Sequence, residues 1–129
     1  MSSLTDFVSQ NKPGNFSPRP LYSRDGDSLF FYFKENPSYG ERVDEFFTLY
    51  RSVETQELTG CQIKGIQCIL KRLGNFGVRI TDYKTVDLRI IFLGYRASVD
   101  DSSQAEIEEL LQAAEESGAH LDREELIPA

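Results

Sequence analysis

The sequence contains no tryptophan, two cysteines, one methionine and one histidine among its 129 residues. No run of about 18 apolar residues occurs, so the pattern offers no membrane-spanning helix. Residues 1–10 (MSSLTDFVSQ) lack a basic start and an apolar centre, so we expect no secretory signal. Cys61 and Cys68 are too few for a disulfide framework, and we expect both to be reduced thiols in a cytoplasmic protein.

Residues that commonly carry chemistry are also scarce. His120, the single histidine, is far in sequence from any nucleophile, which argues against a histidine-based triad. The pair Cys61 and Cys68 has no second pair to complete a zinc site. Residues 25–27 (DGD) lack the further ligands of a calcium loop and predict a turn, and no glycine-rich phosphate loop is present. The sequence therefore predicts no catalytic residues, no cofactor and no metal.

Negative charge is concentrated at the C-terminal end. The formal net charge of -7 divides into +2 for residues 1–99 and -9 for residues 100–129, where Arg123 is the one basic residue. Such an acidic segment is a solvated helix face, binds a basic partner, or docks on a basic face of its own body. The acidic balance argues against nucleic acid, because phosphate binding requires a basic surface.

The stretch from Val43 to Leu73 carries the most consistent local signals. Phe46–Ser52 is aromatic and β-branched, which predicts a strand, and a four-residue polar loop separates it from a second strand at Leu58–Ile63. The period then changes from 2 to 3.6, which predicts a short helix capped by Gly74. The apolar positions of this helix are Ile66, Ile69, Leu70 and Leu73.

Further strands are expected on both sides of this stretch. Leu29–Phe33 is continuously apolar, so we expect both of its faces to be covered in the middle of a sheet or at a subunit interface. Apolar residues alternate at 76–81 and again at 86–92, which predicts a second antiparallel hairpin. The predicted fold class is therefore α+β, an antiparallel β-meander sheet of about five strands with a short mid-chain helix and an acidic C-terminal helix.

The C-terminal helix is predicted at residues 103–117. Ser103 and Glu106 suit a capping box, and Gly118 ends the pattern. The domain organisation that follows is a flexible N-terminal arm at 1–20, a single domain at 21–118, and a frayed tail at 119–129.

Four short motifs resemble a known family. They are DSLFFYF at residues 27–33, VD at 43–44, FTLY at 47–50 and ELTGCQI at 57–63. Together they resemble the small bacterial domain of unknown function numbered 2283, over residues 25–70. The resemblance implies a compact β-meander with a helix and implies no activity. The chain departs from the family at Gln56, where a turn glycine is usual, and in having additional sequence after Leu73.

The aromatic content points to an interaction surface. Nine phenylalanines and six tyrosines exceed what one small sheet face hides, and an interface would cover the excess. We therefore predict a non-catalytic interaction or regulatory module that self-associates, for example as a homodimer, or binds a protein partner. The candidate interface residues are Phe30, Tyr32, Phe46, Tyr50, Ile107, Leu110 and Leu111.

Two alternatives remain open at this point. One is a small-molecule binder or small enzyme with a pocket near Tyr39–Phe47, where Asp44 and Glu45 stand among aromatic residues as a possible acid or base. The other is an RNA-binding sheet in which residues 74–80 form an aromatic strand beside Arg79 and other basic side chains.

Overall fold

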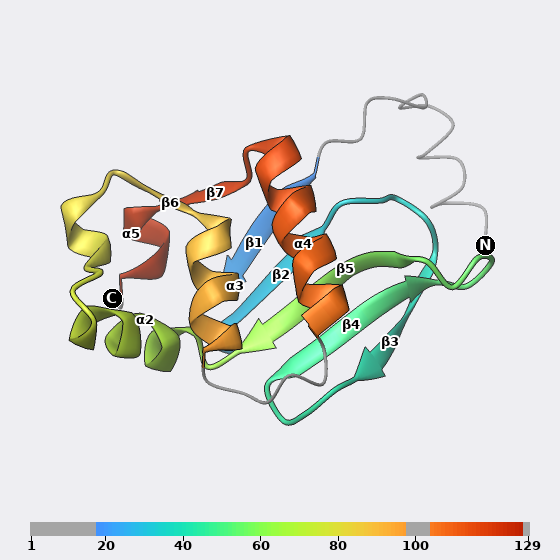
Figure 1. Ribbon diagram of the computed structural model, residues 1–129, viewed down its shortest axis with the longest axis horizontal. Helices are drawn as coiled ribbons and strands as arrows, with labels where there is room; N and C mark the ends of the chain where they lie inside the picture. Colours follow the sequence, from blue (N-terminus) through green and yellow to red (C-terminus); the bar gives the residue numbers. More distant parts are fainter. Residues whose placement is uncertain (1–17, 98–103, 128–129) are drawn as a thin grey trace.

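The computed structural model describes residues 18–97 and 104–127. Five antiparallel strands form one sheet in the order β1-β2-β5-β4-β3 (Figure 1). Together with the helices this confirms the predicted α+β class, although the spatial order of the strands is not their chain order. The strands are β1 (Arg19–Ser23), β2 (Ser28–Tyr32), β3 (Ser38–Arg42), β4 (Phe47–Ser52) and β5 (Leu58–Lys64).

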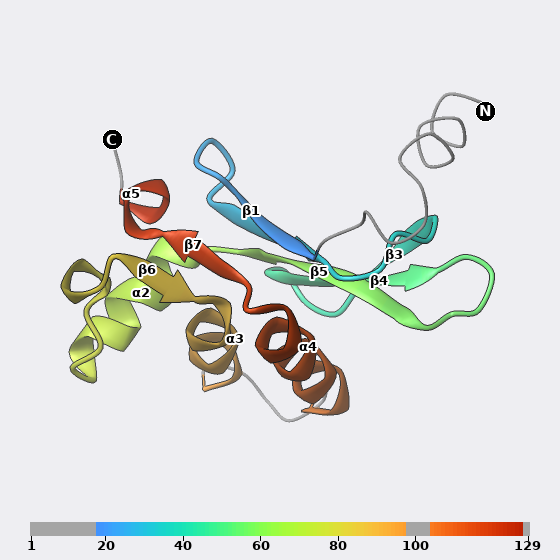
Figure 2. The ribbon, with the colours of Figure 1, turned by 90° about the horizontal axis from the view of Figure 1, so that it is seen from above.

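The remaining elements follow β5 in the chain. They are α2 (Ile66–Asn75), the 3₁₀ turn η1 (Ile80–Asp82), β6 (Thr85–Asp87), α3 (Leu88–Arg96), α4 (Gln104–Ser117), β7 (His120–Asp122) and α5 (Arg123–Leu126). β6 and β7 pair as a separate two-stranded ribbon. Figure 2 shows α3 and α4 together on one side of the five-stranded sheet. The elements therefore form two layers, and no helix of residues 18–97 and 104–127 lies over the other side of the sheet.

The hydrophobic core lies between the sheet and these helices. Alternation along β2, β4 and β5 directs every second side chain toward α3 and α4. Each such side chain stabilises the fold by about 1.5 to 3 kcal/mol before chain entropy is subtracted. The fully buried large side chains include Leu29, Phe31, Phe47, Leu49, Ile63, Ile66, Leu88, Ile91, Phe92 and Leu110.

Ion pairs fasten the acidic helix α4 to the rest of the molecule. Arg51 of β4 contacts Glu41 of β3 at 2.8 Å and Glu106 of α4 at 3.3 Å. Arg96 of α3 contacts Glu108 of α4 at 2.6 Å. Ile107 and Leu110 supply the apolar contact beneath. α4 therefore docks on its own body through these contacts, while Glu109 and Glu116 stay exposed on its outer side.

The predicted hairpin at residues 76–81 and 86–92 is wrong. Residues 76–79 form no strand, Phe76 is 77% exposed, and α3 begins at Leu88. Leu88, Ile91, Phe92 and Tyr95 are buried at the helical spacing i, i+3, i+4 and i+7. Asp87 caps this helix, since its side chain accepts a hydrogen bond from the Arg89 backbone N–H. The same residues fit both periods, and the cap with the burial of Ile91 favours the helix.

Several predicted boundaries also change. Residues 1–17, most of the predicted arm, lie outside the described residues, whereas Arg19 and Pro20 belong to β1. Ser103, the predicted first residue of the acidic helix, also lies outside them. Residues 120–126, predicted as part of a frayed tail, form β7 and α5, and Leu121 and Leu126 are buried.

The predicted cap of the mid-chain helix at Gly74 is wrong. α2 continues through Gly74 to Asn75, and it is Gly77 that adopts a positive φ of 89°. Gln56, at the position where the resembled family has a glycine, adopts a φ of 64°. A left-handed residue is thus present in the β4–β5 loop without glycine, at an energetic cost.

Gly60 of β5 is required by a close contact with β2. A Cβ at this position would lie 2.3 Å from the Phe31 carbonyl oxygen, which is backbone and cannot rotate away. Gly74 of α2 has no atom within 4 Å of an added Cβ.

We predict opposite effects of alanine at these two glycines. Gly60→Ala should lower the free energy of unfolding by about 2 kcal/mol or more, because the added Cβ forces the backbones of β2 and β5 apart. Gly74→Ala should raise it by about 0.5 to 1 kcal/mol through helix propensity. Urea unfolding of both variants and the parent measures the two changes, and a Gly60→Ala variant as stable as the parent would contradict the register of β2 on β5.

Candidate functional site

The face of the sheet opposite α3 and α4 carries a group of aromatic and aliphatic side chains. The register places Leu21 opposite Phe30, Phe30 opposite Gln62, and Tyr50 opposite Gly60, so these residues share one face. Phe46 precedes β4 and lies beside Lys64 of β5, to which its carbonyl oxygen is hydrogen bonded. We call the apolar residues Leu21, Phe30, Tyr32, Phe46 and Tyr50 the open face.

Much of the open face is accessible to solvent. Leu21 is 64% exposed, Phe46 52% and Tyr32 37%. Phe30 and Tyr50 are partly buried. No helix of the described residues lies over this side (Figure 2). As predicted, β2 lies inside the sheet, between β1 and β5. Coverage of its Phe30 and Tyr32 side at a subunit interface stays a prediction.

Tyr32 and Tyr50 form the centre of the open face. Their ring centroids lie 5.2 Å apart, and the rings meet across Gly60, which contributes no side chain between them. The Tyr50 hydroxyl donates to Gln62 Oε1 at 3.3 Å. Burial, together with the neighbouring Tyr50, raises the pKa of Tyr32 to about 12. The Tyr32 phenol is therefore neutral at physiological pH, and the two rings together present an aromatic surface.

The charged residues on this face are cations. Arg19 pairs with Tyr32, Arg42 with Thr48, and Lys64 with Ser28, so the register directs all three to the open-face side. Glu41 is the one carboxylate within the five strands, and it contacts Arg51 on the opposite side of the sheet. The open face therefore combines an aromatic centre with basic surroundings.

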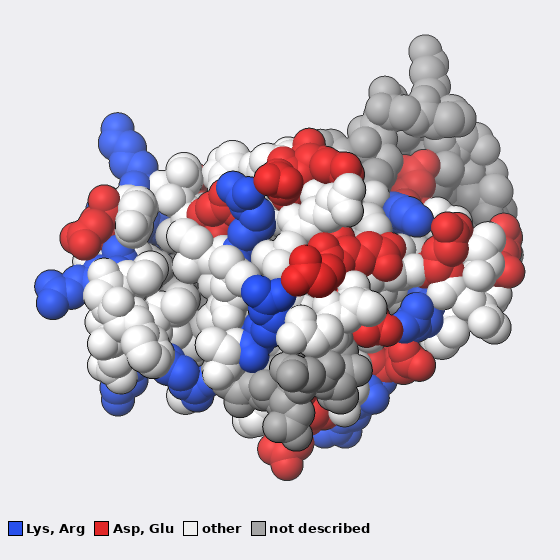
Figure 3. All heavy atoms as spheres, viewed as in Figure 1, with Lys and Arg blue, Asp and Glu red and all other residues white. Residues whose placement is uncertain are grey.

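The opposite surface of the molecule has the reverse character. Between α3 and α4 lies a groove of about 920 Å³. Its apolar floor consists of Ile90, Leu93 and Leu111, and we call these three residues the helix groove. Figure 3, viewed onto these helices, shows acidic side chains over α4. Glu109 and Glu116, which border the groove, form no ion pair with any described residue.

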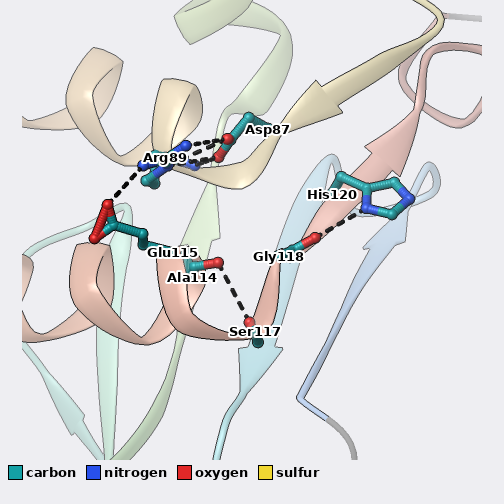
Figure 4. Close-up of polar contacts among 7 residues, drawn as sticks. All are labelled: Asp87, Arg89, Ala114, Glu115, Ser117, Gly118 and His120. Carbon is teal, nitrogen blue, oxygen red and sulfur yellow. Dashed lines mark hydrogen bonds and ion pairs between the residues drawn. The ribbon is translucent and has the colours of Figure 1, made fainter.

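Arg89 joins three elements at one end of the helix groove (Figure 4). It contacts Asp87 at 2.6 Å and Glu115 of α4 at 3.2 Å. The Arg89 hydrogen bond holds the pKa of the Asp87 carboxyl below its usual value. His120 of β7 lies near this cluster, exposed, with Nδ1 3.0 Å from the Gly118 carbonyl oxygen. The Arg89–Glu115 ion pair links α3 to α4.

The predicted acid or base at Asp44 has a structural role. Its Oδ1 accepts hydrogen bonds from the backbone N–H groups of Phe46 and Phe47, at 2.7 and 2.8 Å. Its Oδ2 accepts one from the Tyr95 hydroxyl of α3 at 2.6 Å. Burial and this carboxylate raise the pKa of the Tyr95 phenol above its usual value of 10.0. Asp44 thus ties the start of β4 to α3.

The structure brings four of the seven predicted interface residues together. Phe30, Tyr32, Phe46 and Tyr50 share the open face, and sequence reasoning missed Leu21, whose place in a strand it did not foresee. Ile107 and Leu110 are 2% and 0% exposed in the core, so they have no free surface for a partner. Leu111 lies apart from the open face, in the helix groove.

The alternative sites are only partly assembled. Residues 74–80, predicted as an RNA-binding strand, are not a strand. Tyr39 is 41% exposed on the edge strand β3, whereas Phe46 lines a cavity beside α2.

Cys61 is buried, which raises the pKa of its thiol, and Cys68 is exposed. Among the described residues, no group of three or more side chains is placed to hold a metal ion.

Comparisons with known proteins add no assignment. No family model matches the chain, and neither a curated protein nor a solved structure does. The resemblance to the domain of unknown function therefore stays a prediction. Within residues 18–97 and 104–127, no helix is both long and apolar enough to cross a membrane.

The Tyr95 contact generates a prediction about alkaline stability. A folded-state pKa raised above 10 means that the neutral phenol stabilises the fold fully below pH 10, and that this stability is lost as pH rises further. Tyr95→Phe should lower the free energy of unfolding at pH 8 by about 1.5 kcal/mol, since a hydrogen bond to a charged group is removed. It should also lose less stability than the parent between pH 8 and pH 11.

Urea unfolding at the two pH values measures both effects. Tyr83→Phe is the matched control, because Tyr83 is 47% exposed and changes only a solvated phenol. An alkaline loss of stability equal in Tyr95→Phe and the parent would contradict the role given to this hydroxyl.

Proposed function

We propose that this chain is a protein-interaction module that self-associates, with the open face of one copy binding the helix groove and acidic α4 of another. The observation that carries the proposal is the exposed aromatic side of the sheet, with Leu21 64% and Phe46 52% exposed and no described helix over it. Exposed apolar patches of this kind mark interaction sites in soluble proteins.

Charge favours an acidic occupant for the open face. Arg19, Arg42 and Lys64 surround it, and no strand carboxylate lies on that side. Two open faces placed against each other would bring these cations together, which is unfavourable. The open face has apolar side chains but no strand carboxylates around them. The helix groove has apolar side chains bordered by the carboxylates of Glu109 and Glu116, so its charge is complementary.

The geometry of the aromatic residues favours protein over RNA. Bases stack on aromatic rings whose faces are free, with cations along the backbone path. Here Tyr32 and Tyr50 are tilted against each other at 5.2 Å, and Tyr50 is partly buried. The formal net charge of -7 further opposes a polyanion.

A head-to-tail contact of this kind predicts a specific form of assembly. The two surfaces differ, so a bound pair leaves one open face and one helix groove unoccupied, and the assembly does not stop at a dimer unless the dimer closes into a ring. The weight-average mass from light scattering should rise with concentration beyond twice the mass of one chain. It should fall when salt is added, because the charge contribution is screened.

Leu21→Glu tests the open face directly. It places a carboxylate among aromatic residues that would meet an acidic helix, so we expect association to weaken about tenfold or more and the variant to remain monomeric where the parent assembles. Phe76→Glu is the matched control, because Phe76 is 77% exposed and lies outside the open face. It should assemble as the parent does.

Three results would contradict the proposal. One is a parent chain that stays monomeric at every concentration, and another is a Leu21→Glu variant that assembles unchanged. The third is tight, salt-dependent binding of single-stranded RNA by a monomer, which would assign the open face to nucleic acid instead.

A further inference from the structure

A cavity of about 440 Å³ lies beside α2, apart from the helix groove. Its walls come from the β1–β2 turn, the β4 and β5 ends, α2 and α3. Volumes of this size accommodate small organic ligands. The lining residues are Asp27, Phe46, Lys64, Gly65, Gln67, Cys68, Ile69, Arg72 and Tyr95.

The cavity combines an apolar wall with two basic side chains. Phe46, Ile69 and Tyr95 supply aromatic and aliphatic surface. Lys64 and Arg72 supply positive charge, and neither forms an ion pair within the described part of the chain. An apolar wall with a small number of placed polar groups is the usual composition of a small-molecule site.

Asp27, the one carboxylate of the lining, is hydrogen bonded to β1 and α2. Its side chain accepts hydrogen bonds from the Gln67 backbone N–H at 3.1 and 3.3 Å and from the Tyr22 hydroxyl at 2.6 Å. Its carbonyl oxygen accepts from the Gly65 N–H at 2.9 Å. Asp27 therefore caps the start of α2, where its negative charge is favoured, and the two cations remain to meet a ligand.

We infer that this cavity binds a small amphipathic acid, with its carboxylate at Arg72 and Lys64 and its apolar body against Phe46, Ile69 and Tyr95. Arg72 suits this role because a guanidinium donates two parallel hydrogen bonds to a carboxylate. The inference does not rest on self-association, because the cavity is formed within one chain. Phe46 and Lys64 also lie on the open face, so the cavity is tested at concentrations at which the chain is monomeric.

Cys68 provides a direct readout of occupancy. It is an exposed free thiol in the cavity lining, while the other cysteine, Cys61, is buried and has a raised thiol pKa. Alkylation by iodoacetamide in the folded protein therefore reports on Cys68, and a molecule bound in the cavity slows it.

The experiment uses three probes that share one apolar body: phenylbutyrate, phenylbutanol and phenylbutylamine. The rate of Cys68 alkylation is measured at increasing probe concentration. Each rate is divided by the rate for the same variant without probe. Phenylbutyrate should protect at a concentration about tenfold or more below that of the alcohol, and the amine should protect least. Equal protection by all three probes, or no protection by any, would overturn the inference.

Charge variants on α2 locate the binding. Arg72→Glu should raise the half-protecting concentration of phenylbutyrate about tenfold or more. Lys71→Glu is the matched control, because Lys71 is the preceding exposed residue of the same helix and does not line the cavity. Equal effects of the two variants would reduce the result to general electrostatics and contradict the site.

Leu21→Glu separates this inference from the proposed function. Leu21 lies on the open face and does not line the cavity, so at concentrations at which both are monomeric, phenylbutyrate should protect Cys68 equally in the variant and the parent. Loss of protection in Leu21→Glu would place the probe on the open face and overturn the inference, whatever the state of assembly. Far-ultraviolet circular dichroism of each variant checks that α2 is intact.

Discussion

Packing of α3 and α4 against one face of a five-stranded sheet is the constraint on which the rest of the structure depends. Side chains alternate along each strand, so covering one face commits half of them to the core and leaves the other half outside. Ile91, Phe92, Ile107 and Leu110 are the helical side of this contact. Arg51, which reaches Glu41 and Glu106, holds α4 in place from the sheet side.

The same packing separates the charges of the molecule. α4 turns its apolar stripe to the sheet and its glutamates outward, whereas the far side of the sheet carries Arg19, Arg42 and Lys64 and no strand carboxylate. Two unlike surfaces, one aromatic and basic and one apolar with acidic borders, therefore lie back to back. Surfaces that are complementary within one chain favour contact between copies, and charge of opposite sign speeds their encounter.

The local sequence pattern predicts the secondary structure at the centre of the chain correctly. It fails where the same residues fit both the strand period and the helix period. Phe46–Ser52, Leu58–Ile63 and the helix from Ile66 follow propensity and were predicted close to their observed bounds. Residues 88–92 fit both the strand and the helix period, and the Asp87 cap with the burial of Ile91 decides for the helix. The sequence pattern does not predict β3, whose side chains are all exposed, or β1, in which no residue is fully buried. The high aromatic content of the sequence predicts an interface that includes the aromatic residues of the open face. The positions of Leu21, Lys64 and Arg72 in their sites can be read only from the folded structure.

Complementation between two variants tests the central claim, that two different surfaces of one chain bind each other, most directly. Leu21→Glu disables the open face, and Leu93→Lys disables the helix groove, where Leu93 is 43% exposed. Light scattering should find each variant monomeric alone and an equimolar mixture at twice the mass of one chain, because one intact surface of each kind remains. A mixture that stays monomeric, or a single variant that still assembles, would contradict the account.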